Sequence, residues 1–492
     1  MTITWEQVLA FLCEDQTMAI TSLLFLAFFA AVALINYALP RVLRPYFLLA
    51  ASYGFFCYDP VNRPLVWVIA AATVLTWLCG LIIGKVRAKP VRVLALAASV
   101  GFGIGILVYY KYWNLLADTV GGSILSHREN LLAPLGLSYF TFAAMSYTID
   151  VYKRRCRVET NLLHYALFVS FFPTLINGPI ERYPQMRPQI RKSRRFSYGR
   201  CAGGAFRMLW GYTKKMVLAD NLSHYVSLVY GDVGSMSGPN LVAATVLFAV
   251  QLYMDFSGCC DIALGAARIL GYDLIENFQS PFEARTFNDF WRRWHISMTS
   301  WFRDYVYIPL GGSRCRLRRT CLNLLIVFAL TGLWHGAAWQ YVVFGLLHGM
   351  ILCMERLGLR RALEQLPRLF RHLYTVVLLW LTLVIFGAPG LSEGLAVLKG
   401  IFTWQSGAKG YTLAAFADTK LLADFSGVLP AVRPRAGAVP QAEGGFVREK
   451  GAVPCRDGGA ARAAVSGTYA RHGRHLQRVY LFSILREVQS HA

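Results

Sequence analysis

A series of long, nearly uninterrupted apolar runs is the feature that most constrains how this chain can fold. A helix needs roughly 20 apolar residues to cross a bilayer, and several of the runs approach or exceed that length. Hydrophobic residues make up 55% of the 492 positions and charged residues only 16%. The sequence therefore predicts an all-α, polytopic helical protein of the plasma or inner membrane. The runs are Met18–Leu39, Leu65–Gly84, Val93–Tyr110, Cys321–Trp334 and Leu373–Gly387.

The positive charge lies in short clusters between these runs. The formal net charge of +23 would indicate nucleic-acid binding only if a polar domain carried it on one face. Basic clusters beside membrane spans instead follow the positive-inside rule for cytoplasmic loops. We therefore expect these charges to face the cytoplasm and membrane lipid, and we expect no nucleic-acid partner. The clusters are Arg41 with Arg44, Lys85–Arg92, Lys153–Arg157, Arg187–Arg195 and Arg314–Arg319.

The eleven cysteines form no CxxC pair and show no regular spacing. A disulfide framework or a zinc site is therefore not expected. No HExxH or comparable ligand cluster occurs in the sequence either. We expect no metal and no bound cofactor.

Three segments resemble neither simple spans nor loops. Leu131–Arg155 and Phe171–Met186 place Pro and Gly at membrane depth, which is tolerated where broken backbone is buried in protein or lines a cavity. The third, Gln251–Tyr272, has the period of a helix and many small residues, which favour close helix packing. It also carries Asp255 and Asp261. Pairing of these acids with a nearby arginine or with backbone donors is favoured over direct catalysis.

The segment between two of the basic clusters has a consequence for topology. If Lys153–Arg157 and Arg187–Arg195 both face the cytoplasm, then Asn161–Met186 must enter and leave the membrane on the same side. The Pro and Gly residues in FPTLINGPI supply the break that such a re-entrant segment needs.

The Trp- and Arg-rich segment Arg285–Tyr305 has the period of one amphipathic helix. At about 100° per residue, its aromatic residues share one arc, and Arg292, Arg293 and Arg303 lie opposite. His295 lies at the edge of the apolar arc. Such a helix is typical of the membrane interface. Its arginines are suited to bind phosphates, either of an anionic donor or of lipid headgroups, and the sequence leaves both open.

A second histidine, His335, directly follows the apolar run that ends at Trp334 and is surrounded by small residues. A neutral imidazole there is suited to act as a general base toward a hydroxyl or thiol. Taken alone, such a histidine is more often a hydrogen-bonded structural residue. His348 would lie across the helix from His335 if the helix continued, so we do not expect the two to share a metal.

Several long motifs together indicate a family. They are FFPTLINGPIERY, QLYMDFSGCCDIALGAARILGY, ENFQSPFEAR, FNDFWRRWHISMTSWFRDYVYIPLGGSR and GLWHGAAWQYVVFGLLHG. In order and register, they closely resemble the membrane-bound O-acyltransferase family, and most of all its bacterial branch for alginate O-acetylation. The resemblance covers Tyr46–Phe402. It implies a helical fold around a central funnel or channel, with re-entrant segments.

The resemblance also implies roles for individual residues. The near-invariant active-site histidine of the family falls on His335 in GLWHG, and its second motif histidine falls on His295 in WRRWH. Both are therefore candidate catalytic residues. Donor binding is expected of Arg292, Arg293, Arg303 and Trp334, and a supporting role is expected of Asp255, Asp261 and Asn288.

The chemistry implied is acyl transfer across a membrane. The donor would be acetyl-CoA arriving from the cytoplasm, and the acceptor a hydroxyl of an extracellular polysaccharide or cell-wall glycan. A separate extracytoplasmic transferase usually takes part. His335 would serve as general base or as transient acyl carrier, and the sequence does not choose between them.

Two alternatives stay open. D-alanyl transfer to teichoic acids belongs to the same family, whereas a solute or lipid transporter would be a different class and would predict internal repeats with broken helices in matching positions. We assign residues 1–428 to the membrane domain. Residues 429–492 are rich in Ala, Arg and Gly, and we expect them to be disordered or frame-shifted.

Overall fold

The computed structural model describes residues 18–121, 124–129, 131–175 and 177–407, and within these ranges all regular structure is helical. Six helical stretches of this part are long and apolar enough to cross a membrane. The predicted polytopic, all-α membrane class is therefore confirmed. The boundary at residue 429 and the tail beyond it lie outside the described residues. The six stretches are Arg63–Lys85, Lys89–Val120, Gly238–Ile269, Leu317–His335, Trp339–Gln365 and Arg368–Gly387.

The first predicted span is shorter than expected. Helix α2 covers Leu23–Ala38, which is 16 residues. At 1.5 Å per residue it is about 24 Å long, less than the roughly 30 Å of a bilayer core. Conversely, Gln251–Tyr272 belongs largely to α13 (Gly238–Ile269), whose 32 residues exceed that thickness.

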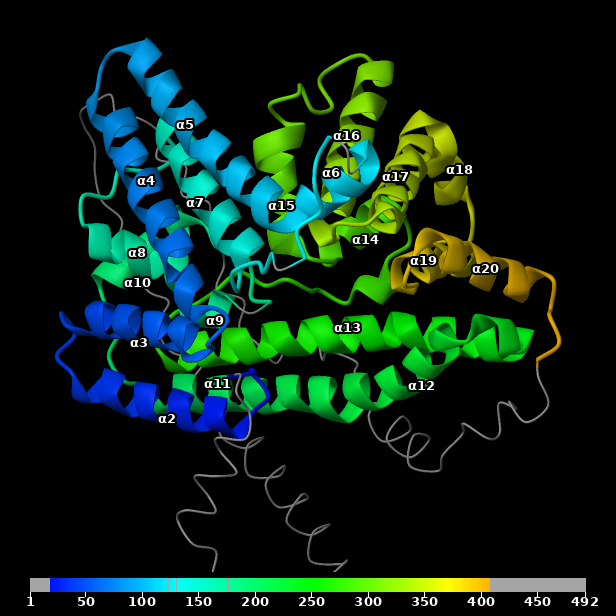
Figure 1. Cartoon of the computed structure of the whole chain (residues 1–492), viewed down its shortest axis with the longest axis horizontal. Helices are drawn as coiled ribbons and strands as arrows, with labels where there is room; N and C mark the ends of the chain where they lie inside the picture. The colour runs from blue at the N-terminus through cyan, green and yellow to red at the C-terminus, as the bar shows by residue number, and fades with distance from the viewer. Residues whose placement is uncertain (1–17, 122–123, 130, 176, 408–492) are drawn as a thin grey trace, which may run out of the picture. The chain divides into compact units, whose positions relative to one another are not determined.

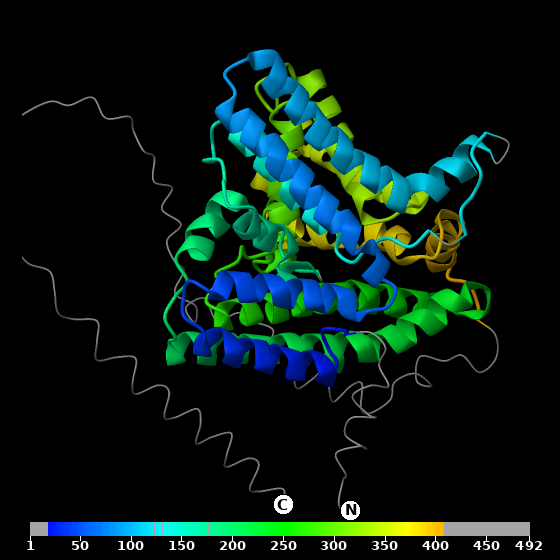
Figure 2. The ribbon, with the colours of Figure 1, turned by 60° about the vertical axis from the view of Figure 1, so that its left-hand side comes forward.

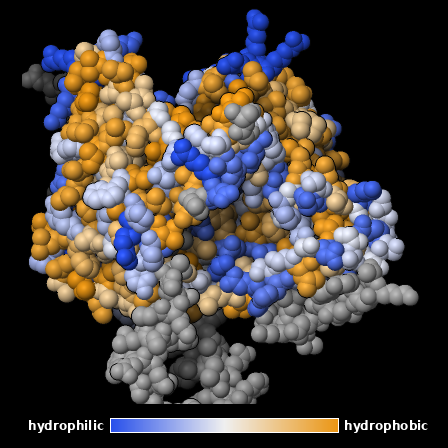
Figure 3. All heavy atoms as spheres, in the orientation of Figure 1, coloured by the Kyte–Doolittle hydropathy of each residue, from blue (hydrophilic) through white to orange (hydrophobic). Residues whose placement is uncertain are grey.

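Helices α4 (Val66–Lys85), α5 (Lys89–Leu107) and α7 (Leu137–Tyr152) pack together as one group (Figure 1). The flank that carries α4 and α5 is largely hydrophobic at its surface (Figure 3), as contact with lipid requires. Helix α5 continues through a π-helical turn, Val108–Tyr112, into α6 (Trp113–Val120). Helix α3 (Arg44–Tyr58) precedes this group.

Helix α13 runs beneath this group and beneath α16 and α17 in both ribbon views (Figures 1 and 2). It packs antiparallel against α11 (Tyr198–Tyr212) through two pairs of glycines. A Cβ atom at Gly211 would lie 2.6 Å from the carbonyl oxygen of Gly258, and one at Gly204 would lie 2.8 Å from that of Gly265. The close helix packing predicted from the small residues is therefore confirmed, because no larger side chain fits at these crossings.

Helices α16 (Leu317–His335) and α17 (Trp339–Met354) form a tight hairpin joined by only three residues. A Cβ at Gly332 would overlap the carbonyl of Tyr341, and one at Gly345 would overlap that of Phe328. Glycine thus lets the two backbones touch. The consequence is that α16 ends at His335 and presents this residue at the tip of the hairpin.

The segment expected to be re-entrant is broken into α8 (Leu162–Ser170), α9 (Phe172–Leu175) and α10 (Tyr183–Arg191). Its two ends meet, because Arg191 Nη2 donates a 2.8 Å hydrogen bond to Glu159 Oε1 and Tyr183 Oη donates one of 2.5 Å to Glu159 Oε2. The two ends of the segment therefore lie close together in space, as a re-entrant path requires. The side of the membrane that these ends face stays a prediction.

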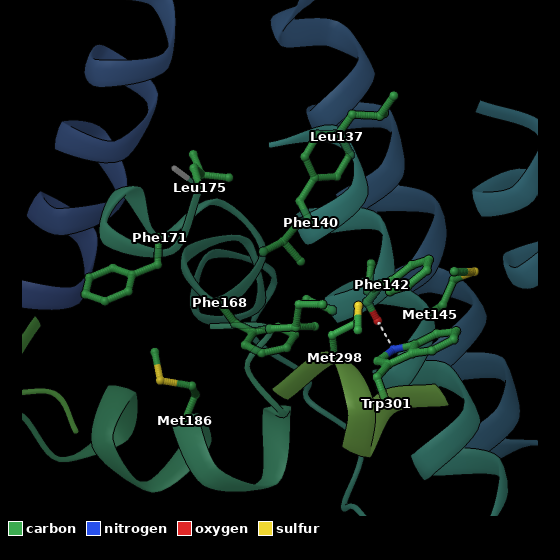
Figure 4. Packing of buried hydrophobic residues seen from close by; sticks show 14 of the residues in the cluster. Leu137, Phe140, Phe142, Met145, Phe168, Phe171, Leu175, Met186, Met298 and Trp301 are labelled. Atoms are coloured by element: carbon green, nitrogen blue, oxygen red, sulfur yellow. Dashed lines mark hydrogen bonds between the residues drawn. The ribbon is translucent and has the colours of Figure 1, made fainter. Parts of the chain in front are cut away.

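The core between α7 and α15 (Ile296–Phe302) is largely aromatic (Figure 4). The rings of Phe142 and Trp301 stack with centroids 4.0 Å apart. Trp301 Nε1 also donates a 2.9 Å hydrogen bond to the carbonyl of Phe142. This contact fixes α15 against α7. The remaining α-helices are α12 (Asp220–Gly231), α14 (Phe287–Arg293), α18 (Arg360–Gln365), α19 (Arg368–Gly387) and α20 (Leu391–Phe402).

Candidate functional site

A cavity of about 330 Å³ lies where α7, α13, α14, α16, α17 and α19 converge. Its wall is mostly aromatic and aliphatic, with a few polar groups, which is the usual composition of a small-molecule site. The polar lining residues are Lys111, Ser138, Asn177, Asp255, His295 and His335. The aromatic ones are Tyr139, Phe256, Phe282, Phe290, Trp291, Trp294, Trp334, Phe344 and Phe386.

His335 reaches this cavity from the C-terminal end of α16. Its ring lies edge-on to Trp334 and Phe386, with both centroid distances 5.2 Å. Within the described part of the chain, no hydrogen bond to its ring nitrogens is recorded. The imidazole is therefore oriented by aromatic packing alone, and its nitrogens are free to meet a substrate.

His295 occupies a break in the helix that the sequence predicted as continuous from Arg285 to Tyr305. Helix α14 ends at Arg293 and α15 begins at Ile296, and His295 between them has φ +47° and ψ +51°. That left-handed conformation costs a non-glycine residue roughly 1–3 kcal/mol, so the surroundings must stabilise it. The prediction of one amphipathic helix was therefore wrong.

The side chain and backbone of Asn277 hold this break in place. The carbonyl of Asn277 accepts a 3.0 Å hydrogen bond from the amide of Ile296, and its Oδ1 accepts one of 3.0 Å from the amide of Ser297. These amides open α15 and lack helical partners. Asn277 itself is buried. The hydrogen bonds of Asn277 thus stabilise the break between α14 and α15.

The His295 side chain is fully buried, although the helical period placed it only at the edge of the apolar arc. Neither ring nitrogen has a hydrogen-bond partner among the described residues, and neither does Trp334 Nε1. The His295 ring lies 4.7 Å from that of Phe256 and 5.3 Å from that of Trp334. Trp334 therefore contacts both histidines. Unpaired buried polar atoms are rare, and here they mark groups awaiting a ligand or water.

Lys111 is a functional candidate that the sequence reasoning missed. It lies on the π-helical turn after α5, a kind of turn that is frequent at functional sites. Its ammonium donates to the carbonyl of Trp334, in the last turn of α16, where carbonyls lack helical partners. No ion pair of Lys111 is recorded within the described ranges. The signal available in the sequence was a lone lysine directly after the apolar run Val93–Tyr110.

The two acids of α13 are both paired with cations, Asp261 with an arginine as the favoured interpretation expected, and Asp255 with a lysine instead. Asp255 lines the cavity and contacts Lys215 Nζ at 2.7 Å. Asp261 contacts Arg207 Nη2 at 2.9 Å and Lys214 Nζ at 2.7 Å, and it is not among the lining residues. Only Asp255 is therefore placed to meet a bound molecule.

The expected donor-binding arginines lie away from this cavity. Arg293 Nε pairs with Asp289 at 2.9 Å, and Arg303 Nε pairs with Asp304 at 2.8 Å. Neither of them, nor Arg292, is a lining residue. They were expected to bind donor phosphates because they form the polar face of the amphipathic segment Arg285–Tyr305, and that role stays a prediction.

Asn288 is exposed and does not line the cavity either. Its backbone amide donates a 3.1 Å hydrogen bond to Glu355 Oε2, while the amide of Phe287 donates one of 2.6 Å to Glu355 Oε1. This carboxylate thus caps the N-terminus of α14, where negative charge is favourable. Of the residues predicted from the sequence, the cavity brings together His335, His295, Trp334 and Asp255.

His348 supports the cavity wall from behind. Trp291 Nε1 donates a 3.1 Å hydrogen bond to His348 Nδ1, and His348 Nε2 lies 2.8 Å from Thr382 Oγ1. Because the Thr382 hydroxyl already donates to the carbonyl of Leu379 at 2.9 Å, His348 Nε2 is the donor in the second contact. The imidazole is therefore neutral and fully satisfied, which identifies it as a structural residue that fixes Trp291.

The chain is similar to known proteins over most of its length. The family described as MBOAT, membrane-bound O-acyltransferase, matches residues 131–403. The chain is 35% identical over 406 residues to "Probable alginate O-acetylase AlgI" of Pseudomonas aeruginosa, covering 79% of this chain and 76% of that protein. It is 33% identical over 409 residues to "Peptidoglycan O-acetyltransferase" of Helicobacter pylori, covering 77% and 76%. "Teichoic acid D-alanyltransferase" of Bacillus subtilis is 28% identical over 237 residues, covering 46% and 59%.

Proposed function

Because this chain belongs to the membrane-bound O-acyltransferase family and is a multi-pass membrane acyltransferase, we propose that it moves acetyl groups from a cytoplasmic donor to hydroxyl groups of an extracellular polysaccharide or cell-wall glycan. Acetyl-CoA is the proposed donor. The acetyl transfer named in the relatives of Pseudomonas aeruginosa and Helicobacter pylori supports the choice of an acetyl group as the group transferred. A partner transferase outside the membrane is part of the proposal.

The observation that carries the proposal is the aromatic cavity with two unpaired histidines. His335 and His295 both contact the ring of Trp334. The ring nitrogens of His295 are buried without a hydrogen-bond partner among the described residues. A neutral imidazole within reach of a hydroxyl can take its proton as that hydroxyl attacks a carbonyl. Aromatic side chains packed around a bound thioester would shield it from hydrolysis.

Two routes of acetyl transfer are compatible with a histidine at this position. With His335 as general base, the acceptor oxygen bonds to the acetyl carbon, its proton moves to the imidazole, the C–S bond breaks, and the thiolate takes the proton. With His335 as carrier, its nitrogen first bonds to the acetyl carbon and releases the thiol, and the acceptor hydroxyl then displaces the imidazole. In both, a negative charge develops on the carbonyl oxygen.

Lys111 is suited to stabilise that charge. Its ammonium has three N–H donors, and the carbonyl of Trp334 uses one of them. Lys111 lines the cavity, so the remaining donors are available to a carbonyl oxygen bound there, where a preorganised positive group stabilises developing negative charge. We assign the oxyanion-stabilising role to this residue.

D-alanyl transfer is less well supported than acetyl transfer. The D-alanyltransferase of Bacillus subtilis matches 46% of this chain, against 79% for the alginate O-acetylase of Pseudomonas aeruginosa. A solute transporter receives no support from the family match.

The test is replacement of His335 by alanine. Loss of a general base typically costs about 10²–10⁴-fold in rate, so we expect glycan acetylation to fall by at least that factor at unchanged protein level. Trace activity would favour the base, and complete loss the carrier. The exposed His127 offers a matched control, and His127→Ala should be as active as the unchanged protein. A well-expressed His335→Ala variant with near-normal acetylation would overturn the proposal.

A further inference from the structure

Three polar residues line the cavity of His295 and His335 without a role in the transfer step. They are Ser138, Asn177 and Asp255, and among the described residues Asp255 is the only acid in this wall. An ionised carboxylate only accepts hydrogen bonds, whereas a carboxamide and a hydroxyl both donate and accept. Together these groups are suited to bind several hydroxyl groups of one molecule.

Asp255 is held in place by a residue that does not line the cavity. Lys215 Nζ contacts Asp255 Oδ1 at 2.7 Å and Asp220 Oδ1 at 2.8 Å. Lys215 lies on the π-helical segment Thr213–Ala219 between α11 and α12, and such segments are frequent at functional sites. Because Lys215 contacts one oxygen of the carboxylate, the other oxygen is available to a bound molecule.

Asn177 is fixed to the same helix, α13, through its backbone. It has φ +50°, a left-handed conformation that asparagine tolerates better than most residues. Its carbonyl accepts a 3.2 Å hydrogen bond from the thiol of Cys260. Cys260 follows Asp255 by five residues, which is about 7.5 Å along the helix axis. Asn177 and Asp255 are therefore close enough for one sugar unit to reach both.

Both residues lie at the open side of the cavity. Asn177 is exposed, and the side chain of Asp255 is 40% exposed, whereas His295 is fully buried. Phe256, next to Asp255 in the chain, has its ring 4.7 Å from that of His295. A molecule bound at the two polar residues would thus extend along an aromatic wall toward the histidines. An apolar wall with a few polar groups that set orientation is typical of a binding site.

The direction of α13 places Asp255 away from the cytoplasmic end of this helix. The carbonyl of Ile269, at that end, accepts a 2.6 Å hydrogen bond from Tyr37 Oη, and the guanidinium of Arg44 lies over the Tyr37 ring at 5.0 Å. The positive-inside rule assigns the cluster of Arg41 and Arg44 to the cytoplasm. Asp255 precedes Ile269 by 14 residues, or about 21 Å, which exceeds half of the roughly 30 Å bilayer core. This position favours access from the outer side, where an extracellular acceptor would arrive.

We propose that Asp255 and Asn177 form the acceptor subsite, and that the acceptor is a sugar with neighbouring hydroxyl groups. One hydroxyl reaches His335 while its neighbour donates a hydrogen bond to the carboxylate of Asp255. This inference rests on the proposed function, since it concerns the acceptor of that reaction. A site built to bind a substrate hydroxyl discriminates against an analogue that lacks it. A lone hydroxyl, such as that of a serine in a partner protein, would leave the carboxylate unused.

The test uses the full-length protein in phosphatidylcholine nanodiscs and measures binding by titration calorimetry. The probes are neutral tetrasaccharides of β-1,4-linked glucose and of β-1,4-linked N-acetylglucosamine, compared with a blocked tetrapeptide that carries one serine. We expect the unchanged protein to bind at least one tetrasaccharide more tightly than the peptide. Asp255→Asn should lower that affinity about tenfold or more, because hydrogen bonds to a charged group are strong.

Asn177→Gly removes the carboxamide but keeps the left-handed backbone, which glycine adopts freely. It should lower tetrasaccharide affinity about two- to tenfold, the range for one neutral hydrogen bond. In acetyl transfer, both variants should raise the KM for the tetrasaccharide by similar factors and leave the KM for acetyl-CoA unchanged. A merely structural role would move both KM values or the amount of folded protein.

Matched controls change the same residue types outside the cavity. Asp118→Asn alters an exposed acid, and Arg154→Gly alters an exposed residue with φ +57°. Both should bind the tetrasaccharide as the unchanged protein does. Lys215 keeps its contact with Asp220 when Asp255 is replaced, so the Asp255→Asn variant should fold. Asp255→Glu retains the charge and should recover part of the affinity.

Failure of this inference and failure of the proposed function are distinguishable. If the unchanged protein binds neither tetrasaccharide, or if Asp255→Asn binds as tightly as the unchanged protein, the subsite assignment is wrong. If the peptide is bound and acetylated in preference to both sugars, acetyl transfer stands and the acceptor class is wrong. If a tetrasaccharide is bound through Asp255 but no probe is acetylated, the subsite stands and the proposed function is wrong.

Discussion

Lys111 and the two histidines show how single residues give a mostly apolar cavity its chemical character. Each is an ionisable side chain inside a membrane domain, where such groups are costly and mark functional sites. Trp334 joins them, because its ring contacts both imidazoles and its carbonyl accepts from the Lys111 ammonium. The three ionisable residues therefore share one contact residue, Trp334, through its ring and its backbone carbonyl.

The role assigned to Lys111 leads to a prediction. Lys111→Met keeps the length and apolar bulk of the side chain but removes the ammonium. We expect kcat to fall about 10²–10³-fold, the usual cost of losing one oxyanion donor, with little change in KM. Steady-state acetylation of a soluble acceptor measures both constants.

Lys111→Arg serves as the control, because it restores the charge, and kcat should recover in part. The ammonium also contacts the end of α16, so a purely structural role is the competing explanation. That role would lower the melting temperature and the amount of active protein while leaving kcat per folded molecule unchanged.

At the level of helices, the break at His295 sets the geometry of the site. Two short helices, α14 and α15, replace one long helix. Of the two residues between them, His295 is fully buried in the interior. The amides of Ile296 and Ser297 depend on Asn277 for their hydrogen bonds. Asn277 thus acts as a positioning residue for His295.

We expect Asn277→Ala to lower kcat through a displaced His295. Removing the side chain leaves the amide of Ser297 buried without its acceptor, which costs about 1–3 kcal/mol. The matched variant Asn277→Asp retains an acceptor oxygen and should keep more activity. Equal activity of the alanine variant and the unchanged protein, per folded molecule, would show that the break does not depend on this contact.

The same break marks the limit of what the sequence could predict. Apolar runs and small-residue patterns are local signals, so four of the six long apolar stretches, the close packing along Gln251–Tyr272 and the broken segment near Pro173 followed from them. The arc of aromatic residues around His295 stays in phase across the break, so periodicity alone could not reveal it. What stabilises the break is Asn277, eighteen residues earlier in the chain.

Lys111 was missed for the same physical reason. Its partner, the carbonyl of Trp334, is 223 residues away, and only the folded arrangement brings them together. The arginines of Arg285–Tyr305 lie outside the cavity, because a helical wheel gives directions only while the helix continues, and their role in donor binding stays a prediction. Residue types were thus predictable where the signal is local, and their assembly was not.

The two ends of the segment expected to be re-entrant are joined by hydrogen bonds to the carboxylate of Glu159, and the contribution of this charge to stability can be measured. Burial disfavours the ionised form of Glu159, but hydrogen bonds from Arg191, Tyr183 and the amide of Asn161 outweigh it and lower the pKa of this carboxyl from 4.5 to about 2. A folded-state pKa below the unfolded one means that the contact stabilises the fold above about pH 4.5. That contribution is lost as the pH falls toward about 2.

We therefore expect Glu159→Gln to lower the melting temperature most at neutral pH. The difference from the unchanged protein should narrow as the pH is lowered from 5 to about 3. Thermal unfolding in detergent at a series of pH values measures this. A difference that is constant or grows on acidification would show that the charge of Glu159 does not close the segment.

At the scale of the whole membrane domain, four of the five basic clusters lie near one another, one pair in direct contact and the others through residues that flank a cluster. Arg44 Nη1 donates to the carbonyl of Arg194 at 2.7 Å. Arg92 Nη2 donates to the carbonyl of Tyr152 at 3.3 Å, next to the cluster that begins at Lys153. Arg191 pairs with Glu159 at 2.8 Å, just after that cluster ends. The clusters therefore gather at one end of the spans, which the positive-inside rule assigns to the cytoplasm.

Cysteine labelling tests this orientation and the re-entrant path together. In a variant whose native cysteines have been replaced, Arg154→Cys and Lys192→Cys should react with an impermeant maleimide only after the membrane is opened. Val61→Cys is the opposite control, because it precedes the other end of α4, whose 20 residues span about 30 Å. Val61 is exposed, so this position should react in intact cells. Labelling of positions 154 and 192 from opposite sides would rule out a re-entrant segment, whereas labelling of both from outside would invert the whole orientation.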